Sequence, residues 1–158
     1  MQRTDSNLNE HIKMEMLNSI RSPQIVDELM KALVELTPML DKEKYRFRVA
    51  ISEIVTNSYL HGNQQNPERT IWISILILTN RIEIVVEDEG DGFTESAISR
   101  KYESDGIYAS GGRGIKIAQK IADKIEWYHT DRGTFAVSVC KYYKLPNEEA
   151  VESVKVKV

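Results

Sequence analysis

The 158-residue sequence predicts an α+β fold, a two-layer sandwich with helices packed on one face of a mixed, mostly antiparallel sheet. Three observations lead to this class. Apolar residues recur at helical spacing in some segments, they alternate with polar residues in others, and a short turn joins two alternating segments. With 41% apolar residues the chain can bury one core, which we expect over residues 10–144, between a flexible N-terminus (1–9) and a C-terminal tail (145–158).

The first two predicted elements are a strand and a helix. Apolar and polar residues alternate over residues 11–16, which is the pattern of a half-buried strand. Ser22-Pro23 predicts the start of a helix, because proline is favoured at the first helical position, and Thr37-Pro38 predicts its end. The expected buried stripe of this helix consists of Ile25, Leu29, Ala32, Leu33 and Leu36.

A second helix and a hairpin are expected next. The helix should run from Asp41 to about Leu60 and end at Gly62. Its apolar side is expected to carry Phe47, Ile51, Ile54, Val55 and Ser58. Two strands follow, at 69–78 and 81–87, and the short turn between them predicts an antiparallel hairpin.

The second half of the predicted domain begins with a long loop. No hydrophobic period persists from Gly90 to Gly114, and a connection of this length in a compact domain is usually functional, so we expect a lid at 93–110. A helix should start near Gly114, with a stripe formed by Ile115, Ala118, Ile121, Ala122 and Ile125. Strands at 126–130 and 134–143 complete the predicted sheet.

Composition excludes several classes of protein. The 21 Lys and Arg against 24 Asp and Glu give a net charge of −3, which argues against a nucleic-acid-binding surface. The single cysteine, Cys140, cannot form an internal disulfide, which agrees with a reducing compartment. The first ten residues are too polar for a signal peptide, and the longest apolar run, 71–78, is too short to span a bilayer. We therefore expect a cytoplasmic protein that binds neither nucleic acid nor membrane.

The first chemical motif is Glu53-Ile-Val-Thr-Asn57 on the second predicted helix. Four residues separate Glu53 from Asn57, so both lie on the same side of the helix, beside the apolar stripe. A carboxylate next to an amide oxygen suits a hard cation that keeps most of its waters, as Mg²⁺ does on nucleotide phosphates. An ordinary solvated helix edge is the alternative reading.

The second motif is Asp88-Glu-Gly90-Asp-Gly92 at the end of the hairpin. Asp88 has the parity of the inward-facing residues of its strand, so its carboxylate is expected on the core face, where it needs a hydrogen-bond donor. The exocyclic amino group of adenine would supply one, whereas guanine presents an acceptor there. Glycines at 90 and 92 would let a flat ring approach the backbone.

Two other readings of this acidic turn fail on spacing. A calcium loop would place its bidentate glutamate at Ile98, and a dinucleotide fingerprint would need its third glycine at Glu95. A plain β-turn remains open as an alternative.

The third motif is Gly111-Gly112-Arg113-Gly114 at the start of the third predicted helix. Unhindered backbone N–H groups at a helix N-terminus form an anion site, and Arg113 would add a charged donor for phosphate. The Lys-Ser/Thr pair of a Walker A loop does not follow. A flexible glycine hinge is the alternative reading.

The order of the three motifs is more specific than any one of them. A helix with Glu-x-x-x-Asn, a hairpin that ends in Asp-x-Gly-x-Gly, a lid, and glycines that open a helix resemble the GHKL (Bergerat-fold) ATPases of gyrase and histidine kinases. The finer pattern, which adds His61-Gly62 and Gly133-Thr134, is most similar to the anti-sigma-factor serine protein kinases. The resemblance spans roughly residues 10–144.

The resemblance implies roles for individual residues. Asn57 would coordinate Mg²⁺, Glu53 would be the catalytic carboxylate, and Asp88 would bind the adenine of ATP, with Thr134 supporting that contact. Four glycines would shape the pocket: Gly90, Gly92, Gly112 and Gly114. The phosphate role of Arg113 rests on its charge, and Lys101 and Lys116 are candidates only.

The implied activity is that of a small ATP-dependent serine/threonine protein kinase. Such a protein phosphorylates a protein antagonist, sequesters a sigma factor when free of that antagonist, and acts as a homodimer. Two alternatives stay open: a detached histidine-kinase-type ATPase domain, and an ATP-binding regulator that changes shape without phosphoryl transfer.

Overall fold

The computed structural model describes residues 9–92 and 113–143, with backbone alone at 113 and 114. The expectations for the first eight residues, for the lid at 93–110 and for the tail at 145–158 lie outside these ranges. So do Lys101 and Gly112.

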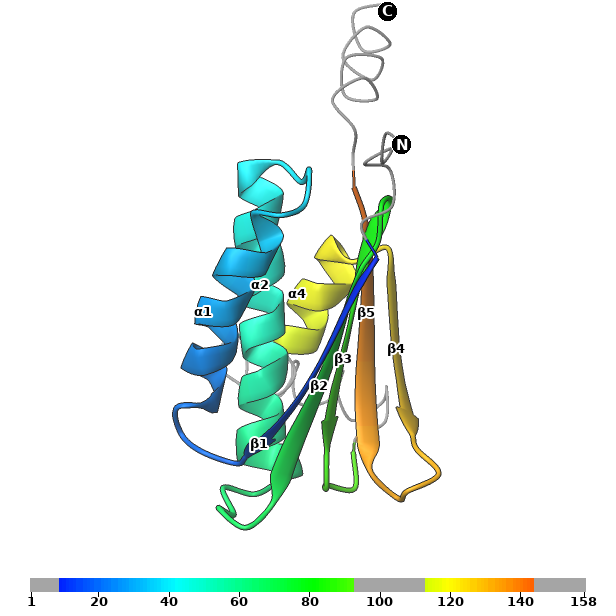
Figure 1. Ribbon diagram of the computed structural model, residues 1–158. Helices are drawn as coiled ribbons and strands as arrows, with labels where there is room; N and C mark the ends of the chain where they lie inside the picture. The colour runs from blue at the N-terminus through cyan, green and yellow to red at the C-terminus, as the bar shows by residue number, and fades with distance from the viewer. Residues whose placement is uncertain (1–8, 93–112, 144–158) are drawn as a thin grey trace, which may run out of the picture.

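Five strands form one open sheet in the order β1-β2-β3-β5-β4 (Figure 1). They comprise Glu10–Leu17, Thr70–Ile77, Arg81–Asp88, Phe135–Tyr142 and Lys124–His129, in that spatial order. Each neighbouring pair is antiparallel, so the predicted mostly antiparallel sheet is confirmed, with no parallel pair among the described strands. The predicted hairpin is the β2–β3 pair, and β1 and β4 form the two edges.

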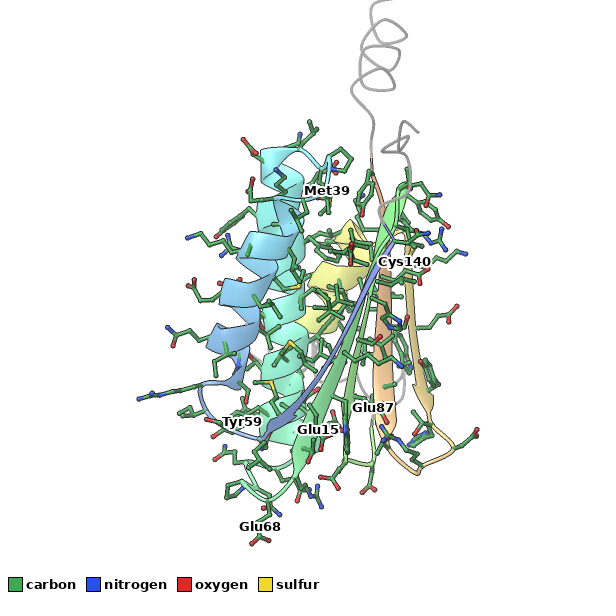
Figure 2. All side chains as sticks on the ribbon, viewed as in Figure 1. Glu15, Met39, Tyr59, Glu68, Glu87 and Cys140 are labelled. Carbon is green, nitrogen blue, oxygen red and sulfur yellow. The ribbon has the colours of Figure 1, made fainter. Side chains whose placement is uncertain are left out.

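The helices cover one face of this sheet, as predicted (Figure 1). They are α1 (Ser22–Val34), α2 (Asp41–Asn57) with a π-helical turn η1 (Ser58–Gly62), and α4 (Arg113–Ile121). The central helix α2 packs against α1 on one side and α4 on the other. Side chains fill the space between the helical layer and the sheet (Figure 2).

The core forms where the inner rows of β2 and β3 meet α2. Alternate residues of both strands are buried, because successive side chains of a strand point to opposite faces. They pack in one cluster with the large apolar residues of α2, namely Phe47, Ile51, Ile54 and Val55. The predicted apolar side of this helix is therefore confirmed, including the buried Ser58 just beyond its end.

The predicted buried stripe of α1 is wrong for most of its residues. Ile25 and Leu36 are 50% and 56% exposed, and Ala32 is exposed as well. The buried face instead consists of Val26, Met30, Leu33 and Val34. Both sets have helical spacing and differ by a rotation of about one residue, so packing against α2 and the sheet, rather than the period, selects the face.

Two boundaries differ from those expected. Regular α-helix ends at Asn57, and the last turn before Gly62 is a π-helix, a form that occurs often at functional sites. The third helix includes Arg113 as its first described residue, in agreement with the start expected near Gly114. Ile125, expected on its stripe, lies in β4, because the helix ends at Ile121.

Candidate functional site

Asp88 is the last residue of β3 and points to the core face, as its parity predicted. Its side chain is only 5% exposed. The backbone N–H of Gly90 donates a hydrogen bond of 2.8 Å to its Oδ1, and the side chain of Ser58 is its second hydrogen-bond partner. A buried carboxylate is thus held at the point where β3 meets the end of the central helix.

The surroundings of Asp88 act on the pKa of its carboxyl in two opposing directions. Burial raises the pKa of the Asp88 carboxyl, because removal from water disfavours the charged form. The hydrogen bonds from Gly90 and Ser58 and the positive charge of Arg69 act against this rise. A carboxylate that is buried yet hydrogen-bonded is a specific acceptor for a donor that enters the site.

Two glycines allow the backbone to come close to this carboxylate. A Cβ at Gly62 would lie 2.3 Å from Oδ2 of Asp88, and a Cβ at Gly90 would lie 2.4 Å from the carbonyl oxygen of Gly62. Gly92 has a φ of +79°, and a Cβ there would strike the ring of Phe135. These contacts give the predicted glycines a structural reason, and they add Gly62 to the set.

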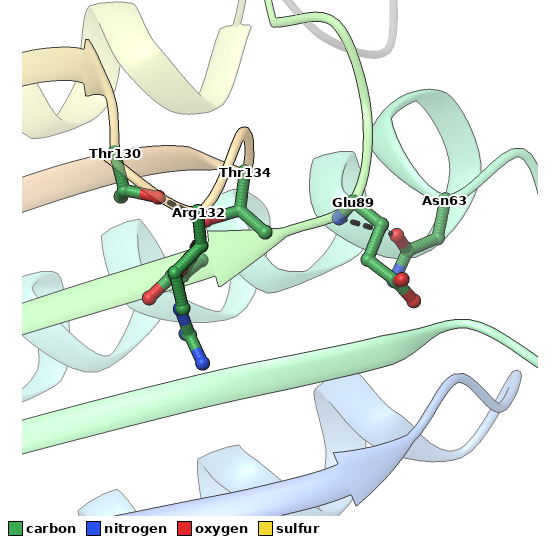
Figure 3. A network of polar contacts seen from close by, with 6 residues as sticks. Asn63, Glu89, Thr130, Arg132 and Thr134 are labelled. Atoms are coloured by element: carbon green, nitrogen blue, oxygen red, sulfur yellow. Dashed lines mark hydrogen bonds and ion pairs between the residues drawn. The ribbon is translucent and has the colours of Figure 1, made fainter.

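A buried amide network fixes the chain beside Asp88. Asn63 is fully buried, and its Oδ1 accepts a hydrogen bond of 2.9 Å from the N–H of Glu89 (Figure 3). Its Nδ2 donates to the carbonyl of Thr70 at 3.0 Å and to Oδ1 of Asn18 at 3.2 Å. The Glu89 carboxylate in turn accepts the N–H of Thr70 at 2.7 Å. The network links η1, the β1–α1 connection, β2 and the end of β3.

The predicted pair Glu53 and Asn57 lies on the last turns of α2. Asn57 is 8% exposed and its side-chain amide oxygen, Oδ1, is fully buried, whereas Glu53 is half-buried. Asn57 directly precedes Ser58, which is a hydrogen-bond partner of Asp88. The structure therefore brings the first two motifs together, at the end of α2 and the end of β3.

The third motif is described in part. Arg113 and Gly114 form the first turn of α4, a helix that packs against α2, and Lys116 is half-buried in the next positions. The N-terminus of an α-helix has N–H groups without an intrahelical partner and a partial positive charge, and both suit an anion.

Thr134 forms hydrogen bonds at the end of the sheet. Its hydroxyl hydrogen-bonds Glu87 and the hydroxyl of Thr130 (Figure 3), and its support of the contact between Asp88 and adenine stays a prediction. Glu87 and Asp88 are consecutive residues of β3 and point to opposite faces of the sheet. Arg132 also pairs with Glu87, at 2.7 Å.

The sequence indicated no role at the site for four residues near Asp88: Ser58, Gly62, Asn63 and Arg69. Ser58 was expected on the apolar side of the helix, and Gly62 at its end and in the family pattern. Asn63 follows it in the sequence, and an asparagine directly after a helix-ending glycine was the available signal. For Arg69, which donates to the Gly62 carbonyl at 3.1 Å, the sequence has no comparable signal.

Comparison with known families now adds to this geometry. Residues 21–141 match the histidine kinase-like ATPase domain. The chain belongs to this family of ATP-binding domains, and the predicted resemblance to the GHKL ATPases is confirmed.

Similar proteins point to one branch of the family. An anti-sigma F factor of Clostridium perfringens is 30% identical over 105 residues, which cover 65% of this chain and 74% of that protein. Another, from Oceanobacillus iheyensis, is 30% identical over 96 residues, which cover 60% of this chain and just under two thirds, 65%, of that protein.

Solved structures show the same fold at low sequence identity. The SiaB–SiaC complex of Pseudomonas aeruginosa aligns with a TM-score of 0.62 at 8% identity, over 85% of this chain and 89% of that one. The RsbU and RsbW domains of a Mycobacterium tuberculosis protein align with a TM-score of 0.60 at 13% identity, over 86% of this chain and 34% of that one. No helix within the described ranges is long and apolar enough to cross a membrane.

Proposed function

We propose that this protein is an ATP- and Mg²⁺-dependent serine/threonine protein kinase that acts as an anti-sigma factor. In this proposal it phosphorylates a protein antagonist and, when free of that antagonist, sequesters a sigma factor. Two findings support it: curated relatives are anti-sigma F factors, and the chain has a buried carboxylate with close glycine contacts that would suit adenine. The observation that carries the proposal is the hydrogen bond between the buried Asp88 at the end of β3 and Ser58, which directly follows Asn57 at the end of α2.

The residues around Asp88 fit the adenine of ATP. The Asp88 carboxylate would accept a hydrogen bond from the exocyclic amino group, in a place where the same carboxylate would repel the carbonyl oxygen of guanine. Gly62 and Gly90 leave no side chain beside the carboxylate, since a Cβ at either position would overlap its neighbours. The Ser58 hydroxyl and the Gly90 N–H keep the carboxylate oriented when no nucleotide is bound.

The residues of α2 fit the phosphate chemistry. The amide oxygen of Asn57 is a hard neutral ligand, suited to a magnesium ion whose other ligands are water and phosphate oxygens. Bound Mg²⁺ would neutralise phosphate charge. Glu53 would accept the proton of the incoming serine or threonine hydroxyl as its oxygen bonds to the γ-phosphorus and the bond to the β-phosphate bridge breaks, leaving ADP. Arg113 and Gly114 would hold phosphate oxygens at the start of α4.

A transfer experiment tests this function directly. The purified protein is incubated with γ-labelled ATP, Mg²⁺ and lysate of the source cells, and the labelled protein and residue are identified. Label on a serine or threonine of a small protein is the expected result. Label on histidine would favour the histidine-kinase-type alternative, and tight ATP binding without any label would favour the regulator.

Two variants separate binding from chemistry. Glu53→Ala should retain ATP affinity while its transfer rate falls by about 10²–10⁴-fold, the usual contribution of a positioned base. Asn57→Ala should instead lose the Mg²⁺-dependent part of ATP affinity, because it removes a ligand. Glu28→Ala, which removes an exposed carboxylate from α1, is the matched control and should change neither quantity. A parental transfer rate in Glu53→Ala would show that this carboxylate is not the base.

A further inference from the structure

The four residues after β3, which we name the β3 loop (89–92), reach from the end of that strand to β4. Asp88 lies opposite Phe135 on β5, and Phe135 lies opposite His129 on β4. Residues directly opposite each other in neighbouring strands share one face of a sheet, so these three form a row on the face that the helices cover. The β3 loop passes over this row.

His129 binds the backbone of the β3 loop. Its Nε2 lies 2.9 Å from the carbonyl oxygen of Asp91. A carbonyl oxygen only accepts hydrogen bonds, so Nε2 carries the proton and donates it. The imidazole also packs edge-on against the ring of Phe135, with 5.3 Å between the ring centroids. Phe135 therefore holds the imidazole in the orientation that directs Nε2 to the Asp91 carbonyl.

Phe135 also supports the next residue of the β3 loop, Gly92. Phe135 is 3% exposed, so its ring is fixed in the core. Gly92 has a φ of +79°, and a Cβ at this position would strike that ring. The backbone of Gly92 therefore lies directly on Phe135, while His129 holds the carbonyl just before it. Two residues of the β4–β5 hairpin thus anchor the second half of the loop.

The first half of the β3 loop is anchored from the other side. The N–H of Glu89 donates to Asn63 at 2.9 Å, and the N–H of Gly90 donates to Asp88 at 2.8 Å. The Gly90 N–H is one of the groups that orient the Asp88 carboxylate. Because this N–H lies one residue before the carbonyl that His129 holds, its direction depends on the anchor at β4 as well.

We propose that His129 is a positioning residue for the nucleotide: by holding the Asp91 carbonyl, it keeps the β3 loop in the shape that binds ATP. This inference rests on the adenine site of the proposed function. A loop that is already ordered loses less conformational freedom when a ligand binds, so the anchor strengthens binding. His129 acts through the loop and not on the reacting atoms, so it should affect ATP affinity and leave the transfer step unchanged.

Two substitutions of this exposed histidine test the inference in the full chain. His129→Leu removes the donor, and His129→Gln keeps an N–H at about the same distance from the backbone. Calorimetry with ATP and Mg²⁺ should show an affinity about 3- to 10-fold lower for His129→Leu, the effect of one hydrogen bond, and a value within about twofold of the parent for His129→Gln. The transfer rate at saturating ATP should be parental in both variants.

His11→Leu is the matched control, because His11 is also exposed and its Nε2 lies 2.8 Å from Oγ of Ser74 on another part of the sheet. It should not change ATP affinity.

Hydrogen exchange of the nucleotide-free protein gives a second readout that needs no ATP. The amides of the β3 loop should exchange at least about threefold faster in His129→Leu than in the parent, and at the parental rate in His129→Gln and His11→Leu. Parental affinity or parental exchange in His129→Leu, or an equal loss in His11→Leu, would overturn the role of His129 alone. A parent that binds no ATP would overturn the proposed function and this role with it.

Discussion

Replacing Gly62 by alanine tests whether the carboxylate of Asp88 depends on the bare backbone beside it. A Cβ at position 62 would lie 2.3 Å from Oδ2 and 2.4 Å from Cγ of Asp88. Carbon and oxygen atoms that are not bonded stay roughly 3.3–3.5 Å apart, so either the carboxylate or the chain at Gly62 must move by about 1 Å. The chain is held by Arg69, which donates to the Gly62 carbonyl at 3.1 Å. We therefore expect the carboxylate to move.

A displacement of this size has a calculable effect on nucleotide binding. The hydrogen bond from the Gly90 N–H to Asp88 is 2.8 Å long, and about 1 Å more takes it beyond the range of a hydrogen bond. The displaced carboxylate would also miss the amino group of adenine. Losing a hydrogen bond to a charged group costs about 1.5–3 kcal/mol, so ATP affinity should fall about 10- to 150-fold in Gly62→Ala.

Calorimetric titration with ATP and Mg²⁺ measures this loss, and Gly133→Ala is the matched control. Gly133 has a φ of +78°, and a Cβ there would meet no atom within 4 Å. An alanine at that position should lower stability by about 1 kcal/mol through backbone strain, while ATP affinity stays at the parental value. Parental affinity in Gly62→Ala, or an equal loss in both variants, would refute the reasoning.

Three further variants test the surroundings of the site. Asp88→Asn should weaken ATP binding yet raise the thermal midpoint of the nucleotide-free protein at neutral pH, because it removes a buried charge. Burial raises the pKa of Asp88, so the parent becomes more stable as the pH falls through that pKa, and the difference between the two thermal midpoints should shrink in acid. Asn63→Leu removes a fully buried amide and leaves its hydrogen-bond partners unpaired. It should lower the unfolding free energy by about 2–5 kcal/mol in urea titrations. Tyr143→Phe removes a buried hydroxyl that has no partner among the described residues, and burial raises the pKa of Tyr143 to about 12, so chemical denaturation should show no loss of stability.

Local patterns predicted the sheet and the direction of Asp88. Period-two alternation depends on a property of the strand itself, the opposite direction of consecutive side chains, and the structure obeys it in β1, β2 and β3. The burial of Asp88 follows from the same rule applied to a polar residue. The sequence is therefore sufficient to predict which side chains of a strand are buried, because the geometry of the strand alone decides it.

Features that depend on two distant segments could not be predicted in this way. The buried face of α1 is chosen by what α2 and the sheet present to it, and both Ile25 and Val26 lie on stripes of suitable spacing. The contact of Gly62 with Gly90 joins positions on two elements, and only the fold brings them together. The hydrogen bond of Thr134 with Glu87 also joins two distant segments, the turn between β4 and β5 and the end of β3, and no local pattern indicates it.

The energetic cost of burying the Asp88 carboxylate explains why compensating groups surround it. An ionised carboxylate at 5% exposure lowers stability unless donors compensate, and here the donors are a glycine N–H, a serine hydroxyl and the field of an arginine. The next residue, Glu89, is fixed through its own N–H by Asn63. In the proposed adenine site, restraint of the chain on both sides of the carboxylate would reduce the reorganisation needed when adenine binds, because the acceptor would already have its final direction. On this hypothesis, the amide network supplies the order that a buried, destabilising charge needs in order to bind a ligand.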